Sequence, residues 1–320
     1  MDTTVIIPNY NGIRYLEACL QSLRDTAGEG FKIIVVDDGS SDGSVELVRD
    51  SFPDVELVVH DANRGFAASV NTGIRAADTE YVILLNNDTV VREHFVTALR
   101  EAIDADEKIF SVSAKMLRMD DPDIMDGAGD HYSALGWAFA YKKGKKAADC
   151  NSARSIFSAC AGAAIYRRKV LNDLGLFDER HFAYLEDVDI GYRARIEGYK
   201  NIYCPGAEVL HAGSGFSGSR YNEFKVNLSS RNSTYLICKN MPVLQQLINL
   251  PFLMLGFGIK IVFFILKGYG GTYIKGIFKG IAMGYDKKGR EKRVRFKVAN
   301  LGSYAAIQLQ LWINIFRRFA

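Results

Sequence analysis

The sequence predicts an α/β fold, in which a mostly parallel sheet is covered by helices on both faces and is followed by a C-terminal helical region. Two observations lead to this prediction. Over the first 115 residues, short runs of apolar and β-branched residues alternate with runs of helical periodicity. Beyond residue 240, the composition becomes apolar and strongly basic. The overall content of 48% hydrophobic and 24% charged residues is that of a folded chain.

Strands and helices are expected to alternate in the first half of the chain. Apolar and β-branched runs predict buried strands at residues 3–7, 31–36, 55–59, 81–85 and 110–114. Helical spacing of apolar residues predicts the intervening helices, at residues 16–23, around 45–48, at 67–77 and at 92–105. Ser41 or Asp42 is expected to cap the second of these helices.

Three loops of this predicted sheet carry polar residues directly after a buried strand, at residues 8–12, 37–41 and 86–89. Ligands of parallel α/β sheets bind beyond the carboxyl ends of the strands, so these loops are the expected binding site. The carboxylates of Asp37 and Asp38 can accept hydrogen bonds from a base or from ribose hydroxyls. Asp88, beside two asparagines, is a hard oxygen ligand suited to Mg²⁺ or Mn²⁺.

The same residue types also make turns and helix caps, and this plainer interpretation is preferred for Asp42. For Asp88 the ligand interpretation is preferred, because two amides and a carboxylate at a strand end exceed what a turn requires.

Four motifs in order resemble those of family-2 glycosyltransferases of the GT-A fold, a Rossmann-like fold, and especially bacterial rhamnosyltransferases and galactofuranosyltransferases. The resemblance covers roughly residues 3–240. The motifs are Ile7-Pro8-Asn9-Tyr10-Asn11, Val36-Asp37-Asp38-Gly39-Ser40-Ser41-Asp42-Gly43-Ser44, Asn63-Arg64-Gly65-Phe66-Ala67 with Asn71, and Leu84-Leu85-Asn86-Asn87-Asp88.

The resemblance implies a nucleotide-sugar site in the first half of the chain. It places Pro8, Asn9, Tyr10 and Asp37 or Asp38 at the nucleotide base, and Asn63, Arg64, Gly65 and Asn71 at the nucleotide and its diphosphate. Asn86-Asn87-Asp88 stands where the family has its DXD motif, with Asp88 as the metal-binding carboxylate. Asn86 replaces the first acid of that motif, so the motif offers one carboxylate ligand instead of two.

The second half of the chain is expected to supply the base and the acceptor site. Glu186-Asp187 opens a predicted helix at residues 186–197 and matches the family's ED motif, in which Asp187 aligns with the general base. Asp187 is then expected to remove the proton of an acceptor hydroxyl in a single, inverting displacement. Its place at a helix N-terminus predicts an ionised carboxylate. Glu186 is expected to bind the acceptor, and Asp189 to form an ion pair with Arg193.

Two further features have both a structural and a functional interpretation. The small residues at 160–164, including Gly162 and Ala163, could let an acceptor sugar approach the backbone or could form a tightly packed strand. A lone histidine after a strand, as His211 is, is more often structural. Relatives have a metal or diphosphate ligand in this place, so the resemblance makes His211 the second metal ligand. The loop at 213–220 is predicted to close over the donor, with Arg220 on phosphate.

The C-terminal region differs sharply in charge from the rest of the chain. Residues 239–320 carry 14 Lys or Arg and two acids, a formal charge of +12, whereas the preceding 238 residues carry 26 basic and 35 acidic residues, a charge of −9. The apolar stretch at 250–266 is 17 residues long. As a helix it would span roughly 26 Å, short of the ~30 Å hydrocarbon core of a bilayer.

We therefore expect a catalytic domain at residues 1–240, with a nucleotide-sugar half up to about 115 and an acceptor half beyond it, and a membrane-associating region at 241–320. Its helices, including one at 301–316, are predicted to lie in the cytoplasmic leaflet of the cell membrane, as in a peripheral or monotopic protein. The lysines and arginines would contact anionic headgroups. The alternative is that these helices pack on the catalytic domain or on a second copy of the chain.

Composition excludes several other classes of protein. The five cysteines have neither a disulfide-framework nor a zinc-site spacing, so a reducing cytoplasm is expected. The N-terminus lacks the basic segment of a signal peptide. No nucleic-acid-binding motif accompanies the basic residues, so no nucleic-acid partner is expected. A sugar nucleotidyltransferase would need a Gly-rich basic loop after Ile7, which the sequence lacks.

The function predicted from the resemblance is an inverting glycosyltransferase of cell-surface polysaccharide synthesis. Its donor would be dTDP-rhamnose or a UDP-sugar, and its acceptor a glycan or a polyprenyl-diphosphate-linked saccharide. The alternative is a non-catalytic nucleotide-sugar-binding scaffold of a polysaccharide assembly complex.

Overall fold

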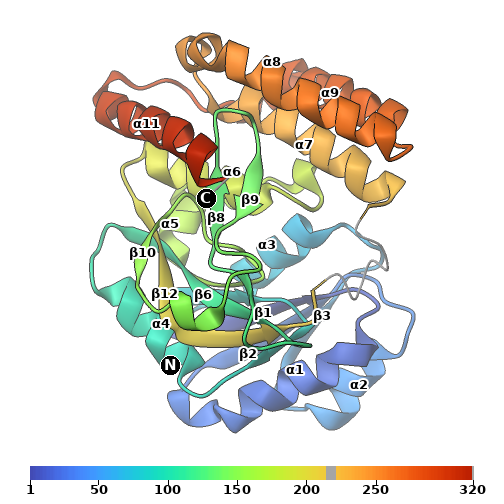
Figure 1. The fold of residues 1–320 in the computed structure, drawn as a ribbon. Coiled ribbons are helices and arrows are strands. Elements are labelled where there is room, and N and C mark those ends of the chain that lie inside the picture. The colour runs from blue at the N-terminus through green and yellow to red at the C-terminus, as the bar shows by residue number, and fades with distance from the viewer. Residues whose placement is uncertain (214–220, 319–320) are drawn as a thin grey trace.

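The computed structural model describes residues 1–213 and 221–318 (Figure 1). A ten-stranded mixed sheet forms the centre of the molecule, and its main path runs β10-β12-β6-β11-β4-β1-β2-β3. The C-terminal helices gather on one side, far from α1 and α2. The predicted α/β fold is confirmed. Most of the loop expected to close over the donor, including Arg220, lies outside the described residues.

The first four predicted strands form the parallel part of the sheet. They are β1 (Thr3–Asn9), β2 (Lys32–Asp37), β3 (Glu56–Val59) and β4 (Tyr81–Leu85). β1 lies between β2 and β4, and β3 pairs with β2 at the edge. Their carboxyl ends therefore meet along one edge of the sheet, as the sequence predicts.

The rest of the sheet is mixed because one antiparallel strand is inserted. β11 (Ala163–Arg167) lies between β4 and β6 (Ile109–Arg118) and runs antiparallel to both. β12 (Lys200–His211) runs parallel to β6 and is bordered by the antiparallel β10 (Arg154–Ile156). The short β5 (Thr89–Val91) and β7 (Met125–Gly127) pair with β12 and β6. β8 (Asp130–Tyr132) and β9 (Ala138–Ala140) form a separate hairpin.

Helices cover both faces of the sheet because successive strand residues point to opposite sides. In β1, Val5 and Ile7 pack with α1 (Ile13–Asp25) and its neighbours, whereas Ile6 packs beneath α3 (Phe66–Ala76). The first face also carries α2 (Ser44–Ser51) and α4 (Phe95–Asp104). The second also carries α5 (Arg168–Asp173) and α6 (Glu186–Ile196). The N-cap of α2 is Gly43, so the predicted cap at Ser41 or Asp42 is wrong by one or two residues. The carboxylate of Asp42 instead accepts the N–H groups of Ser44 and Ile13, which ties the start of α2 to the start of α1.

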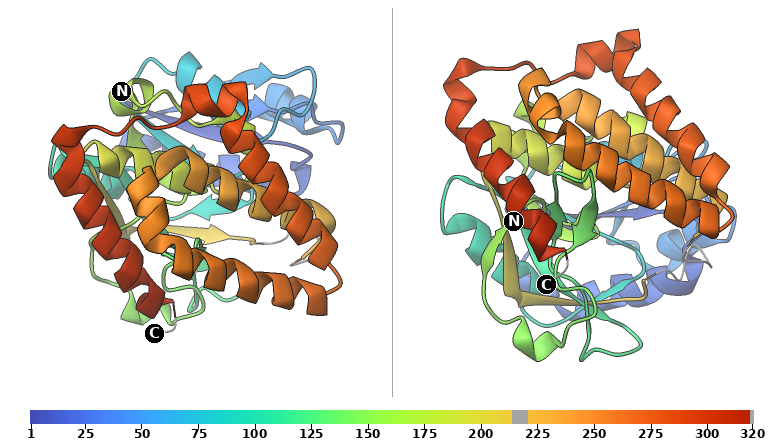
Figure 2. Two further views of the ribbon diagram at one scale, coloured as in Figure 1. Left: turned by 90° about the horizontal axis from the view of Figure 1, so that it is seen from above. Right: turned by 45° about the horizontal axis from the view of Figure 1, so that its top comes forward.

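Five helices complete the chain: α7 (Glu223–Asn240), α8 (Val243–Leu266), α9 (Gly270–Tyr285), α10 (Lys287–Lys292) and α11 (Leu301–Arg317). α7, α8 and α9 lie side by side, and α11 crosses beside them (Figure 2). A row of glycines on α9, Gly276, Gly280 and Gly284, faces α7 so closely that a Cβ on any of them would collide with Ser230, Arg231 or Cys238. The two helices therefore touch backbone to backbone.

α8 is amphipathic in an unusual sense, because its polar side chains face the protein and its apolar ones face outward. Gln245 and Asn249 are buried, and Gln245 accepts a hydrogen bond from Tyr192. The exposed apolar residues of the helix include Val243, Leu244, Leu247, Met254, Leu255, Val262 and Leu266, each more than half exposed. Within the described residues, α8 is the one helix long and apolar enough to cross a membrane. It begins seven residues before the predicted apolar stretch.

We predict that Gly280→Ala destabilises the protein by about 1–3 kcal/mol, because the added methyl group pushes α9 away from α7. Gly271→Ala, on the same helix with open space around it, is the matched control. It should be neutral or stabilising by up to about 1 kcal/mol, since alanine favours helix. The free energies of unfolding of the two variants in denaturant test this, and equal values would contradict the packing role of the glycine row.

Candidate active site

The carboxyl ends of β1, β2 and β4 are joined by hydrogen bonds between predicted site residues. The amide of Asn9 donates to the carboxylate of Asp37 at 2.7 Å, and the amide of Asn87 donates to the Asn9 carbonyl oxygen at 2.6 Å. Pro8 lies in β1 beside Val36, and Tyr10 is 36% exposed at the strand end. The structure therefore brings the three predicted loops together at one edge of the sheet.

Both aspartates after β2 are buried and already accept hydrogen bonds within the protein. Asp37 accepts the Ser40 N–H, and Asp38 accepts the backbone N–H groups of Arg64 and Gly65 and lies 2.7 Å from His60 Nδ1. Asp38 thus fixes the loop at residues 60–65 against the end of β2.

That loop carries the residues predicted to hold the diphosphate. Asn63 accepts the Gly65 N–H, and the Arg64 side chain is half exposed, 3.9 Å from Glu179. Gly65 has a φ of 90°, and a Cβ there would lie 2.5 Å from the Phe182 ring. Glycine is required at this position because of both its positive φ and the lack of space for a side chain.

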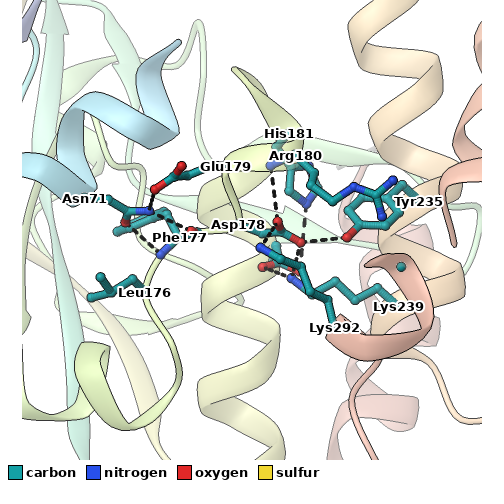
Figure 3. A network of polar contacts seen from close by, with 12 residues as sticks. Asn71, Leu176, Phe177, Asp178, Glu179, Arg180, His181, Tyr235, Lys239 and Lys292 are labelled. Carbon is teal, nitrogen blue, oxygen red and sulfur yellow. Dashed lines mark hydrogen bonds and ion pairs between the residues drawn. The ribbon is translucent and has the colours of Figure 1, made fainter. Parts of the chain in front are cut away.

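Asn71 has a different environment from the one expected. It is 1% exposed, its amide donates to the Phe177 carbonyl and to Glu179, and its oxygen accepts the Phe177 N–H (Figure 3). Both amide hydrogens are used, so Asn71 joins α3 to the segment that precedes α6.

Asp88 and His211, which are far apart in sequence, lie together because β5 pairs with the end of β12. His211 Nε2 is 3.3 Å from Asp88 Oδ1, and His211 Nδ1 is 2.7 Å from Asp126 Oδ2. Burial disfavours the charged imidazolium, but the two carboxylates outweigh it and raise the pKa of His211 to about 9.

These three residues suit a divalent cation. Two ligands at right angles, each about 2.1 Å from a metal, lie about 3 Å apart, close to the separation of Asp88 Oδ1 and His211 Nε2. A carboxylate on the second ring nitrogen is the usual support of a metal-bound histidine, and Asp126 supplies it. The sequence prediction missed Asp126, which lies at the edge of a Gly-rich stretch with no clear periodicity.

Asp187 lies in the first turn of α6, beside another acid that the sequence prediction missed. One side-chain ligand atom each of Asp187, Asp130 and Cys160 lies within 4.8 Å of the others. Desolvation raises the pKa of Asp187, although the backbone N–H groups of Val188 and Ala161 act to lower it. The pKa of Asp130 is raised well above its ordinary value by desolvation and by the nearby charge of Asp187. The position of Asp187 at a helix N-terminus favours its ionised form, and its desolvation opposes ionisation. The trio also consists of residue types that can ligate a metal.

Glu186 is 6% exposed, and its Oε2 has no hydrogen-bond partner among the residues that the structure describes. Burial and the neighbouring Asp187 raise its pKa well above the ordinary range. Asp189 contrasts with it, because it is held by Arg193 at 2.7 Å, which confirms the predicted ion pair, and by Lys239 at 2.9 Å.

The small residues at 160–164 join the two halves of the site. The Gly162 carbonyl accepts the Asn86 N–H at 2.8 Å, and Ala161 donates its N–H toward Asp187. Ala163 begins β11, so the stretch is partly a packed strand. Asp187 and Asn86 therefore lie next to two consecutive residues, Ala161 and Gly162. The loop at residues 86–88 and the acids around Asp187 thus belong to one site.

Comparison with known proteins identifies the family. The model of the family described as glycosyl transferase family 2 matches residues 4–175. The chain belongs to glycosyl transferase family 2. The predicted family is confirmed, and as a member the chain is a glycosyltransferase that uses a nucleotide-sugar donor.

Two relatives of this glycosyltransferase come from Mycobacterium tuberculosis. An N-acetylglucosaminyl-diphospho-decaprenol L-rhamnosyltransferase is 27% identical over 237 residues, which cover 65% of this chain and 75% of the relative. A pre-mycofactocin glycosyltransferase is 29% identical over 216 residues, 66% of this chain and 42% of that protein.

Solved structures with little sequence identity share the GT-A fold. Residues 1–349 of S. aureus TarS with UDP-GlcNAc match with a TM-score of 0.59 at 16% identity, covering 97% of this chain and 89% of that one. A mannosyltransferase of Pyrobaculum calidifontis with GDP-Man and Mn²⁺ matches with a TM-score of 0.54 at 18% identity, covering 96% and 87%. GT-A neighbours thus bind Mn²⁺.

We expect the affinity for Mn²⁺, measured by calorimetry in the presence of a nucleoside diphosphate, to fall roughly 10- to 100-fold in Asp126→Asn, because His211 loses the carboxylate that orients it. Asp88→Asn should reduce it further. Asp120→Asn, which changes an exposed carboxylate nearby, is the control. Unchanged Mn²⁺ affinity in both Asp126→Asn and Asp88→Asn would place the cation elsewhere.

Proposed function

We propose that this glycosyltransferase transfers a sugar with inversion, from dTDP-rhamnose or a UDP-sugar to a glycan or a polyprenyl-diphosphate-linked saccharide, with Asp187 as the general base. One observation carries the proposal: two consecutive residues connect the two parts of the site. The Ala161 N–H lies beside Asp187, and the Gly162 carbonyl accepts the N–H of Asn86 in the loop at 86–88. A donor bound at the three loops would thus present its anomeric carbon toward Asp187. One mycobacterial relative is named as an N-acetylglucosaminyl-diphospho-decaprenol L-rhamnosyltransferase, which supports a rhamnose donor and a polyprenyl-diphosphate-linked acceptor.

The chain's own residues divide the chemistry between them. Asp187 accepts the proton of the acceptor hydroxyl as its oxygen attacks the anomeric carbon, and one such displacement inverts the configuration. Its raised pKa makes it a better proton acceptor than an exposed aspartate. Glu186, whose Oε2 has no hydrogen-bond partner among the described residues, would contact the acceptor. The expected acceptor contacts of Gly162 and Ala163 are not retained, because both residues are buried and Ala163 is 0% exposed in β11.

The donor side is formed by the ends of the parallel strands. Pro8, Asn9, Tyr10 and the Asp37–Asp38 turn enclose the base, and Asn63, Arg64 and Gly65 lie at the diphosphate. Asp88 and His211, with Asp126 behind, would hold Mg²⁺ or Mn²⁺. Such a cation neutralises the charge that develops on the departing nucleoside diphosphate.

Asp187→Asn should lower the rate of sugar transfer by roughly 10²- to 10⁴-fold, since the amide cannot accept the proton. Donor binding, followed by calorimetry with a nucleotide sugar, should stay within about twofold, because the substitution leaves the three donor loops intact. Full transfer activity would remove Asp187 as the base. A wild-type protein that binds the donor but releases no nucleoside diphosphate with any membrane extract would instead favour the non-catalytic scaffold.

We further propose that the C-terminal helices bind the cytoplasmic face of the cell membrane. Further exposed apolar side chains lie on α9 (Phe278) and on α11 (Leu309, Trp312 and Phe316), two helices that lie beside α8 (Figure 2). Exposed cations flank this apolar surface: Lys267, Lys275, Lys279, Lys287, Lys288, Arg290 and Arg295. An apolar face rimmed by cations is the pattern of a helix that lies in an anionic interface.

Replacing Leu244, Leu247 and Leu255 together by Gln should weaken binding to anionic phospholipid vesicles by roughly 100-fold or more, since each loses over 1 kcal/mol of apolar burial. Val59→Gln, at an exposed apolar position on β3, is the control. Vesicle flotation measures the binding, and uncharged vesicles should bind the wild type less well. Wild-type levels of vesicle binding by the triple variant would contradict the proposal, and a dimer in solution that dissociates in the variant would make this surface a contact between copies.

A further inference from the structure

The backbone that leads into the general base is strained. Phe182 has φ 64° and ψ −65°, and the Ala183 N–H donates to the His181 carbonyl at 2.8 Å. This is the rare, strained form of the γ-turn. Tyr184 and Leu185 follow with φ of 70° and 68°. Three non-glycine residues with positive φ cost roughly 1–3 kcal/mol each, so surrounding contacts must impose the conformation.

Those contacts come largely from α7, through two consecutive side chains. The amide nitrogen of Asn232 lies 3.0, 2.9 and 2.7 Å from the carbonyl oxygens of His181, Ala183 and Tyr184, so its two hydrogens are shared among three acceptors. The guanidinium of Arg231 donates to the carbonyls of Arg180 and His181.

The two remaining carbonyls of this segment are also bound. The Phe182 carbonyl accepts the Ala67 N–H, at the start of α3, and the Leu185 carbonyl accepts the Asp189 N–H within α6. Every backbone carbonyl from Arg180 to Leu185 therefore has a donor, and Asn232 serves three of them.

Asn232 is itself held in one orientation. It is 0% exposed, and Arg231 Nε donates to its carbonyl oxygen at 3.0 Å, which directs the amide nitrogen toward the loop. Leu185 precedes the first residue of α6, so the loop that Asn232 fixes determines where Glu186 and Asp187 begin.

Other residues of α7 hold the segments on either side of this loop. Tyr235 and Lys239 donate to Asp178 at 2.7 and 2.9 Å, just before the loop, and Lys239 and Asn240 donate to Asp189, just after it (Figure 3). Lys292 of α10 also donates to Asp178. The strained loop thus lies between two segments that α7 holds through ion pairs, at Asp178 and at Asp189.

We propose that Asn232 is a positioning residue for catalysis, which holds the strained loop at residues 181–185 so that Asp187 meets the acceptor hydroxyl. This inference rests on the proposed role of Asp187 as the base. It extends the active-site machinery to α7, beyond the residues that the family model matches.

The test compares Asn232→Ala with Asn249→Ala in the full-length protein. Asn249 is also 0% exposed and makes three side-chain hydrogen bonds, with Gln245 and Gln308 as partners. Asn232→Ala should lower kcat for sugar transfer by roughly 10- to 100-fold, as a displaced base does, with the donor Kd within about threefold. Asn249→Ala should keep kcat within about twofold at a similar loss of thermal stability. A kcat within twofold of wild type in Asn232→Ala, or equal losses in the two variants, would overturn the proposal.

The pH profile separates positioning from simple destabilisation. Loosening the loop admits water to Asp187, so the acid limb of kcat/KM should move to lower pH by about half a unit or more in Asn232→Ala. A smaller active fraction would lower the profile without moving it, and that result would count against the proposal. If Asn232→Ala does not fold, Arg231→Gln is used instead, because Arg231 is half-buried and also donates to the His181 carbonyl; it must show a loss of kcat and a shift in the same directions.

The two proposals fail in different ways. If Asp187→Asn keeps its activity, the proposed base is wrong whatever Asn232→Ala does. If Asp187→Asn is inactive and Asn232→Ala is as active as the wild type, the base stands and the positioning role is wrong.

Discussion

The site depends on one constraint, the insertion of the antiparallel strand β11 between β4 and β6. Ala163 pairs with Leu85, the last residue of β4, so the residues just before β11 must pass the loop that follows β4. That passage puts the Gly162 carbonyl on Asn86 and the Ala161 N–H on Asp187. Without this strand, the loops at the carboxyl ends of the parallel strands would have no acidic cluster beside them.

The buried acids near α6 fall into two electrically different groups. Burial alone would raise the pKa of Asp189, yet Arg193 and Lys239 outweigh it and hold that pKa well below the ordinary value. Glu186 is buried and Asp187 and Asp130 are half-buried, and the pKa values of all three are raised. The pKa of Asp187 is therefore raised and that of Asp189 lowered, although the two are only two positions apart on α6, because Arg193 and Lys239 contact Asp189 alone. Paired acids hold the helix in place, and the unpaired ones can exchange protons.

Much of the parallel half could be predicted because β1 to β4 are short, strongly apolar and separated by clear helical periodicity; β4 has the predicted bounds. The loops that follow them were found by the strand-end rule alone. Asp126 and Asp130 could not be found this way, since the strands around them are three residues long and have no measurable period. α7 was missed because Ser, Asn and Thr, poor helix formers, fill its middle, and its helix is stabilised by contact with the α9 glycines. The helix terminus at Asp187 is visible in the sequence, whereas the desolvation that raises its pKa is not.

The glycine row of α9 has a practical consequence for handling the protein. α7 holds the loop at residues 181–185 with one face and contacts α9 with the other, so the apolar C-terminal helices are structural partners of the catalytic domain's core. Truncating the chain before α8 to obtain a soluble fragment would strip the partner from Ser230 and Thr234 and leave α7 half uncovered. Detergent or nanodisc extraction of the intact chain is therefore the sounder route to crystals and assays.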